Sequence, residues 1–377
     1  MSTSTIVEDP MRLKTIIAAV CVLCVAAAAA DHALACTSIR MKTAEGAVFY
    51  ARTMEYAYPT ESSISVIPAG TVLQGTLPDA TMGGLKWTAK YGFGGMNSHG
   101  LPSIVDGVNE KGLIVGELVF VGYAGYQPFE QDKAGRTIAQ YDLPNWLLSN
   151  FATVAEVKEG IKDVRVCQGP EASQGVTIGP LPLHFTVHDA TGASLAIEYV
   201  DGVLNVHDNP LGVLTNAPPL PWMLTYLSNY VNLTAVNVPM RKLGGFTVHQ
   251  FGQGSGMLGL PGDFTPPNRF LRMVALTQSA IPAKGLDAGL NLAMTVIDNV
   301  DIPLGSVRQE DAGGEILELT QWAVAVDSTR LRYYFRTYDN KNWRYVDIGK
   351  ALAGAKSILT FPVATPVDYP EVKALAK

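Results

Sequence analysis

The sequence predicts an α+β protein built around large antiparallel sheets. Runs of alternating apolar and polar residues, typical of half-buried strands, occur towards both ends of the chain, and separate stretches of helical periodicity lie among them. The chain has 377 residues, of which 47% are hydrophobic and 16% are charged, so it can bury a sizeable core. No linker, low-complexity tract or repeat follows residue 35, and we therefore expect one domain over residues 36–377.

Strand signals occur in three parts of the chain. Five segments alternate as antiparallel strands should, and they cover residues 47–52, 63–67, 184–188, 194–200 and 203–207. The turns Ala190-Thr191-Gly192 and Asp201-Gly202 connect the last three segments, which indicates a series of hairpins. Residues 321–348 are rich in Trp, Tyr and Phe and return to strand character.

Three segments have the periodicity of helices. The first begins at Thr153, because Glu156 three residues later completes a capping box ahead of the apolar residues Val157 and Ile161. The other two cover residues 268–278 and 286–300.

The first 35 residues are typical of a bacterial export signal. Basic residues precede an apolar run over residues 15–30, and the small residues Ala33 and Ala35 stand just before Cys36. The apolar run is shorter than the ~20 residues that span a bilayer, so we interpret residues 1–35 as a signal peptide that is removed rather than as an anchor. The protein would then be periplasmic or secreted, with Cys36 as its first residue.

A cysteine at that position is a candidate nucleophile. An α-amine has an unperturbed pKa of about 8 and can accept the thiol proton near neutral pH, so no histidine partner is required. Lipoprotein processing would also leave Cys36 first but would block its amine and its sulfur, and Ala33 fits that pattern poorly. A disulfide with Cys167 is an alternative in an exported protein. We favour the interpretation of Cys167 as a small hydrophobic residue in the core.

Composition and motifs exclude several other classes of site. The net charge of −6 gives no indication of nucleic acid binding. The histidines after residue 35 form no HExxH motif and accompany no cysteine pair, so we predict neither a metal nor a cofactor. His184 and His188 lie four apart on a predicted strand, where we expect surface or turn positions. Residues 254–259 match a dinucleotide pattern but run into Pro261, which indicates a loop of tight turns.

Five blocks of sequence, in order, resemble the choloylglycine hydrolase family, which contains bile salt hydrolases and penicillin V acylases. The blocks are Cys36-Thr37, residues 51–56 (ARTMEY), 106–113 (DGVNEKGL), 212–218 (GVLTNAP), and 259–266 (GLPGDFTP) followed by Arg269-Phe270. The resemblance implies the fold of N-terminal nucleophile hydrolases, a four-layer αββα sandwich with the catalytic terminus at the end of a central strand. It also implies a homotetramer that acts on a small-molecule N-acyl amide and uses no cofactor. No association with a membrane is expected once the signal is removed.

The resemblance carries specific roles onto matching residues. Cys36 would attack the amide carbonyl. Arg52 matches the family arginine beside the nucleophile, where a fixed positive charge would lower the thiol pKa, and Arg269 matches a second arginine near the thiol. Asn216 would donate to the oxyanion. Glu55 stands where the family usually has an aspartate that contacts the amine of the nucleophile, and it reaches one methylene further.

A second departure from the family pattern is Val119, where many relatives have asparagine or an aromatic residue in the oxyanion hole. The backbone N–H of Val119 can still contribute there, so the valine bears on substrate choice rather than on catalysis. Met54, Tyr56 and Val119 are expected to line an apolar substrate pocket.

The sequence therefore predicts a hydrolase of linear amides with an N-terminal cysteine nucleophile, acting on N-acyl amides such as conjugated bile acids or penicillin V. An N-acyl homoserine lactone acylase is an alternative. A non-catalytic exported lipoprotein or binding protein of the same fold is another.

Overall fold

A computed structural model describes residues 35–373 except 171, 174–175, 178–180 and 312–313. The signal peptide predicted for residues 1–35 lies outside these residues, apart from Ala35. No helix within the described part is long and apolar enough to cross a membrane.

Two antiparallel sheets form the centre of the domain. In spatial order, the smaller sheet contains β16 (Val213–Leu214), β1 (Ala35–Lys42), β2 (Val48–Glu55), β21 (Thr320–Asp327), β22 (Arg332–Thr337) and β23 (Arg344–Asp347). The larger sheet contains β15 (Val203–Asp208), β14 (Ser194–Val200), β13 (Leu183–His188), β8 (Ile114–Val119), β7 (Ile104–Asn109), β6 (Phe93–Asn97), β3 (Ser63–Ile67) and β24 (Leu359–Pro362).

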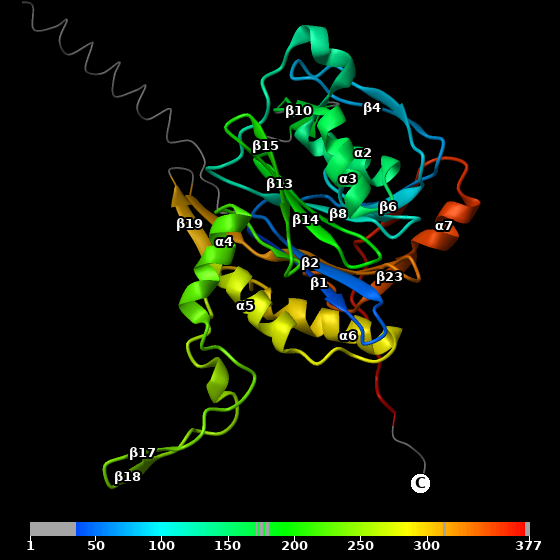
Figure 1. The fold of residues 1–377 in the computed structure, drawn as a ribbon. Coiled ribbons are helices and arrows are strands. Elements are labelled where there is room, and N and C mark those ends of the chain that lie inside the picture. Colours follow the sequence, from blue (N-terminus) through cyan, green and yellow to red (C-terminus); the bar gives the residue numbers. More distant parts are fainter. Residues whose placement is uncertain (1–34, 171, 174–175, 178–180, 312–313, 374–377) are drawn as a thin grey trace, which may run out of the picture. The chain divides into compact units, whose positions relative to one another are not determined.

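Helices cover the outer face of each sheet. Helices α5 (Pro266–Ser279) and α6 (Leu286–Ile297) pack on β1 and β2, and α2 (Leu143–Asn150) packs on β7 and β8, close to α3 (Val154–Gly160) (Figure 1). Three apolar clusters fill the spaces between successive layers, which is why strands of both sheets are buried on both faces. The expected four-layer αββα sandwich is confirmed.

Most of the predicted elements agree with the structure. The Thr153 hydroxyl accepts a hydrogen bond from the backbone N–H of Glu156 at the start of α3, as the capping box requires. The helix predicted over residues 286–300 is α6 followed by a 3₁₀ turn, η6 (Asp298–Val300). Residues 321–348 cover β21, β22 and β23, three successive strands that are connected as hairpins and do not form one continuous strand.

The prediction for His184 and His188 was wrong. Both side chains are fully buried, because their strand β13 is an interior strand of the larger sheet. His184 stacks on Phe120 at 4.3 Å between ring centroids and hydrogen-bonds the Thr215 carbonyl. Burial lowers the pKa of His188 to about 3, so this imidazole is neutral at physiological pH.

The two described cysteines, Cys36 and Cys167, are both free and buried. The alternative of a disulfide between them is therefore wrong for this structure, and Cys167 packs as a small hydrophobe whose thiol contacts the Ile138 carbonyl oxygen at 3.4 Å.

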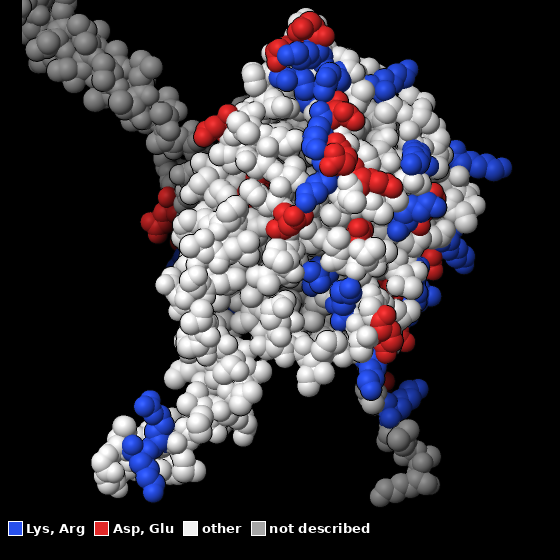
Figure 2. All heavy atoms as spheres, viewed as in Figure 1, with Lys and Arg blue, Asp and Glu red and all other residues white. Residues whose placement is uncertain are grey.

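A segment over residues 231–258 carries a small hairpin, β17 (Arg241–Leu243) and β18 (Phe246–Val248), away from the sandwich (Figure 1). We call this segment the arm. Its exposed apolar side chains are Val231, Val236, Val238, Met240, Leu243, Phe246, Val248, Phe251 and Leu258. Figure 2 shows the arm as mostly uncharged, with basic groups near its end, where the sequence has Arg241 and Lys242.

Candidate active site

Cys36 lies at the beginning of β1, an interior strand of the smaller sheet, and is fully buried. The β1–β2 register pairs Cys36 with Met54 and Ser38 with Arg52. This pairing brings Arg52 Nη2 to 3.5 Å from Cys36 Sγ, and Met54 Sδ to 3.9 Å. The register of one hairpin thus places a guanidinium beside the thiol.

The Arg52 guanidinium is held from several sides. Nη1 donates to the Val105 carbonyl at 2.9 Å and lies 3.6 Å from Asp106 Oδ2. The Asp106 carboxylate also accepts hydrogen bonds from the Tyr50 and Tyr333 hydroxyls at 2.6 and 2.8 Å. All of these groups are fully buried, and this fixes the position of the positive charge.

Two residues from distant parts of the chain contact the main chain of Cys36. Asn216 follows β16, and its Oδ1 accepts from the Cys36 N–H at 2.9 Å. Arg269 on α5 donates through Nη1 to the Cys36 carbonyl at 2.6 Å and through Nη2 to Asn216 Oδ1 at 2.6 Å. Residues separated by up to 233 positions therefore converge on the main chain of one residue, Cys36.

The Asn216 amide group is oriented by these contacts. Because Oδ1 faces Cys36 and Arg269, the NH₂ group points the other way and donates to the Val119 carbonyl at 2.8 Å. An amide NH₂ has two hydrogens, and the second can donate to another acceptor.

The pKa of the Cys36 thiol is raised by burial, and the charge of Arg52 and a backbone hydrogen bond from Val119 act against that rise. We expected Arg52 to lower the thiol pKa. It does act in that direction, but desolvation outweighs it in the chain with Ala35 attached.

Glu55 is fully buried and pairs with Ala35, not with Cys36, in the β1–β2 register. Its Oε1 accepts from the Thr320 hydroxyl at 2.8 Å, and its Oε2 has no hydrogen-bond partner among the described residues. Burial raises the pKa of Glu55 to about 7, against the opposing charge of Arg269. The carboxyl therefore lies beside the residue that signal removal would take away.

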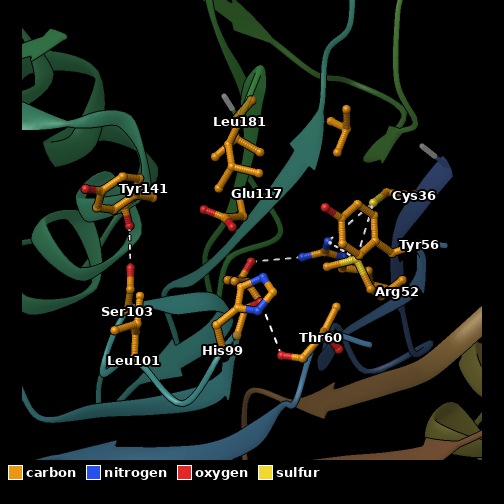
Figure 3. Close-up of a pocket in the computed structure, with 15 residues that line it drawn as sticks. Cys36, Arg52, Tyr56, Thr60, His99, Leu101, Ser103, Glu117, Tyr141 and Leu181 are labelled. Atoms are coloured by element: carbon orange, nitrogen blue, oxygen red, sulfur yellow. Dashed lines mark hydrogen bonds between the residues drawn. The ribbon is translucent and has the colours of Figure 1, made fainter. Parts of the chain in front are cut away.

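A pocket with about 700 Å³ of empty space, open solvent included, reaches the Cys36 thiol (Figure 3). Met54, Tyr56 and Val119, the three residues expected at a substrate pocket, all lie on its wall. The other lining residues are Cys36, Arg52, Thr60, Ser98, His99, Leu101, Ser103, Val105, Glu117, Tyr141, Leu181 and Leu183.

Residues 36–360 match the sequence model of the linear amide C–N hydrolases, choloylglycine hydrolase family. The chain belongs to the choloylglycine hydrolase family. It is therefore an amidohydrolase that acts on linear amide bonds, as the sequence predicted.

Similar proteins within the choloylglycine hydrolase family cover most of the chain. A bile salt hydrolase/transferase of Clostridium perfringens is 33% identical over 86% of this chain and 96% of its own. A penicillin V acylase of Pectobacterium atrosepticum is 28% identical over 80% of this chain and 77% of its own. The crystal structure of a mutant conjugated bile acid hydrolase from Clostridium perfringens is similar, with a TM-score of 0.79 and 30% identity, over 90% of this chain and 100% of that chain. The fold is that of the N-terminal nucleophile hydrolases.

Several residues of the pocket in this member of the choloylglycine hydrolase family were not found by sequence reasoning. Glu117 is the only charged residue in the apolar run 113–120, and that isolation is a signal that the sequence offers. His99 lies in a loop with a positive φ of 54°, and no local pattern marks its place on the wall. Within the described residues, no three His, Cys, Asp or Glu side chains gather in a way that could hold a metal ion.

Proposed function

We propose that this chain is exported, loses residues 1–35, and hydrolyses N-acyl amides with Cys36 as an N-terminal nucleophile. The observation that carries the proposal is the position of Cys36, which lines a largely apolar pocket and has the buried Arg52 guanidinium 3.5 Å from its sulfur. A thiol with no catalytic role has no need of a pocket or of a fixed cation.

The reaction begins when the α-amine takes the thiol proton and Cys36 Sγ attacks the amide carbonyl carbon. The carbonyl oxygen becomes an oxyanion, which the free N–H of Asn216 and the backbone N–H of Val119 stabilise. The intermediate collapses as the amine product leaves with the proton that the α-ammonium returns. Water then cleaves the thioester, releases the acid and regenerates the thiol.

Removal of Ala35 is essential to this mechanism. With Ala35 attached, the Cys36 nitrogen is a peptide N–H that donates to Asn216 Oδ1, and a peptide nitrogen cannot act as a base. Cleavage would convert the same atom into an amine, with Asn216 Oδ1 as an acceptor and the Glu55 carboxyl close to the vacated position. An ammonium there would lower the pKa of Glu55 and favour its carboxylate form.

The pocket favours an apolar acyl group. Met54, Leu101, Val119 and Leu183 contribute hydrocarbon surface, and Tyr56 contributes an aromatic ring. Relatives named as bile salt hydrolases and a penicillin V acylase make conjugated bile acids and penicillin V the first substrates to test. Long-chain acyl homoserine lactones present the same combination of an apolar acyl group and a linear amide.

The test combines the terminus and the activity of the exported protein. We expect N-terminal sequencing and intact mass to show a chain that begins at unmodified Cys36 and that hydrolyses at least one of glycocholate, taurocholate, penicillin V and a long-chain acyl homoserine lactone. A blocked or different terminus in a protein that still hydrolyses amides would contradict the mechanism. A lipidated Cys36 without activity would favour the binding-protein alternative.

The arm supports the proposal of a homotetramer. It exposes at least 70% of the surface of Val231, Val236, Phe246 and Phe251, more apolar area than a free monomer usually presents in one segment. We expect light scattering to give a tetramer, and the double variant F246S/F251S to give smaller species. Ile281→Ser, which removes an exposed apolar side chain outside the arm, is the matched control.

A further inference from the structure

Glu117 occupies an unusual place for a carboxyl group. It lies in the middle of β8 and lines the same pocket as Cys36. Side chains alternate along a strand, so Glu117 shares a face with Val115 and Val119, and these two belong to the apolar cluster under α2. Figure 3 shows the Glu117 carboxyl with Ser103 and Tyr141 on one side and Cys36 and Arg52 on the other.

The carboxyl is buried and its Oε2 is unpartnered. Glu117 is only 6% exposed, and Oε2 has no hydrogen-bond partner among the described residues. A buried polar group without a partner destabilises a fold, so its presence calls for a partner that arrives from outside.

No described side chain neutralises Glu117. The charged groups that act on it are Arg52, Asp106 and Asp142, and Tyr126 also lies within electrostatic range. Arg52 is already engaged by Asp106, by the Val105 carbonyl and by the Cys36 thiol. Burial, together with the two aspartates, outweighs Arg52 and raises the pKa of Glu117 to about 8. At neutral pH the group is a carboxylic acid, with one O–H donor and one carbonyl acceptor.

We propose that Glu117 is a specificity-determining residue that hydrogen-bonds an uncharged oxygen function, a hydroxyl or a ketone, on the acyl group of the substrate. The proposal rests on the proposed function, since it assumes that the acyl group occupies this pocket. Its basis is geometric: an unpartnered polar atom, buried and on the pocket wall, in a site otherwise dominated by apolar side chains.

The strand geometry places the oxygen function away from the scissile bond. Glu117 and Val119 are two residues apart, which corresponds to about 7 Å along a strand. The Val119 backbone is the part of β8 that lies against the thiol. The group that Glu117 contacts is therefore several bonds from the reacting carbonyl, in the body of the acyl group and not next to the amide.

A neutral acid also selects against other acyl groups. A wholly hydrocarbon acyl group would exclude water from the pocket and leave Glu117 Oε2 without a partner. Binding of such a group is therefore disfavoured by the same desolvation that raises the pKa of Glu117. An acyl group that bears an amine would pair well only with an ionised Glu117. Ionisation is disfavoured because Asp106 and Asp142 repel a negative charge at this position.

The experiment compares matched substrates on the processed enzyme. Glycocholate and glycodeoxycholate differ by a single ring hydroxyl, and N-decanoylglycine can be compared with derivatives that carry a hydroxyl or an amine at successive positions of the chain. The enzymes are the wild type, Glu117→Gln, which keeps a donor and an acceptor, and Glu117→Leu, which keeps neither.

For at least one pair, the wild type is expected to prefer the hydroxylated member by about tenfold or more in kcat/KM. Glu117→Gln should retain a preference of the same sign, and Glu117→Leu should lose or reverse it. Equal ratios in the wild type and Glu117→Leu for every pair would overturn the proposal, and so would a preference for the amine-bearing member that depends on Glu117.

Failure of the two proposals can be told apart. If the processed wild type cleaves neither this panel nor taurocholate, penicillin V and a long-chain acyl homoserine lactone, both proposals fall. Cleavage with ratios that Glu117→Leu leaves unchanged overturns only the role of Glu117. Circular dichroism checks that the variants fold, and Glu117→Ala, which also removes the donor and the acceptor, takes the place of Glu117→Leu if the leucine is not accommodated.

Discussion

The Arg52 guanidinium and the Cys36 thiol form a buried pair, with Nη2 3.5 Å from Sγ. Burial raises the pKa of the thiol, and Arg52 is the foremost influence that lowers it. Because Arg52 is itself held by Asp106 and by the Val105 carbonyl, its charge cannot move away from the sulfur. A thiolate at this position therefore depends on one fixed cation.

Replacement of Cys36 by serine is expected to reduce amide hydrolysis almost to background. The hydroxyl is a much weaker acid than the thiol, and the α-amine alone does not activate it to the same degree. Steady-state hydrolysis and circular dichroism should show an inactive but folded protein. Cys167→Ser is the matched control, and unchanged activity in Cys36→Ser would rule out the thiol as nucleophile.

Replacement of Arg52 by glutamine should shift the titration of Cys36 to higher pH. Loss of a neighbouring positive charge raises a thiol pKa by about one to three units. The pH dependence of alkylation by iodoacetamide measures this shift in the processed protein. In the single variant, the buried Asp106 would lose its counter-charge and destabilise the fold. The double variant R52Q/D106N removes that charge as well, so that the shift in the Cys36 titration can be measured without this destabilisation. An unshifted alkylation profile would show that Arg52 is not the counter-charge.

Asn216→Ala is expected to lower kcat by about 100-fold or more, because in the proposed mechanism Asn216 donates to the developing oxyanion. The partly buried Asn205 provides the control, since Asn205→Ala deletes the same amide on β15, outside the pocket. Single-turnover acylation should reveal the defect. A loss smaller than tenfold would point to a different donor.

Glu55 is expected to act through the α-ammonium that the proposed removal of residues 1–35 would create. Glu55→Asp keeps the charge and should retain most of the activity, whereas Glu55→Gln should lower kcat/KM by about tenfold. Intact mass must show that both variants begin at Cys36, so that processing and catalysis are separated. Equal activity of the two variants would exclude a role for the negative charge.

Glu117 should make the folded protein less stable as the pH rises, whereas most native carboxyl groups have the opposite effect. Its folded-state pKa is raised from 4.5 to about 8, so between these values the unfolded chain loses the proton while the native state keeps it. The penalty to folding is absent below about pH 4.5, grows until about pH 8 and is constant above. Glu117→Gln should therefore exceed the wild type in free energy of unfolding by a few kcal/mol at pH 8 and by little at pH 5.

Denaturant unfolding at these two pH values measures the difference. Glu371→Gln changes an exposed glutamate and serves as the control. A gap of equal size at both pH values would contradict the raised pKa.

Local sequence was sufficient for several features. The capping box at Thr153 and Glu156 is decided by residues three apart, and the hairpin turn at Asp201-Gly202 by two neighbours. The motif blocks likewise marked Cys36, Arg52 and Asn216, because each lies within a short stretch of family sequence. These predictions needed no knowledge of how distant segments pack.

Burial and orientation could not be predicted in the same way. Alternation shows which residues of a strand share a face, but not whether a second layer covers that face. His184 was wrongly placed for this reason, since its burial depends on neighbouring strands and on Phe120. The same limit hid Glu117, whose face becomes a pocket wall only when strands of both sheets come together.

The amino-acid sequence alone indicated the chemistry that we propose, namely a thiol that becomes a terminus and the charged and amide groups that accompany it. Only the tertiary structure decided how these groups meet, because contacts such as that between Arg269 and Cys36 join positions 233 residues apart. The orientation of Asn216, the pairing of Glu55 with Ala35 and the unpartnered oxygen of Glu117 all result from such long-range packing. Side-chain type is local information, whereas register, burial and desolvation are properties of the assembled layers.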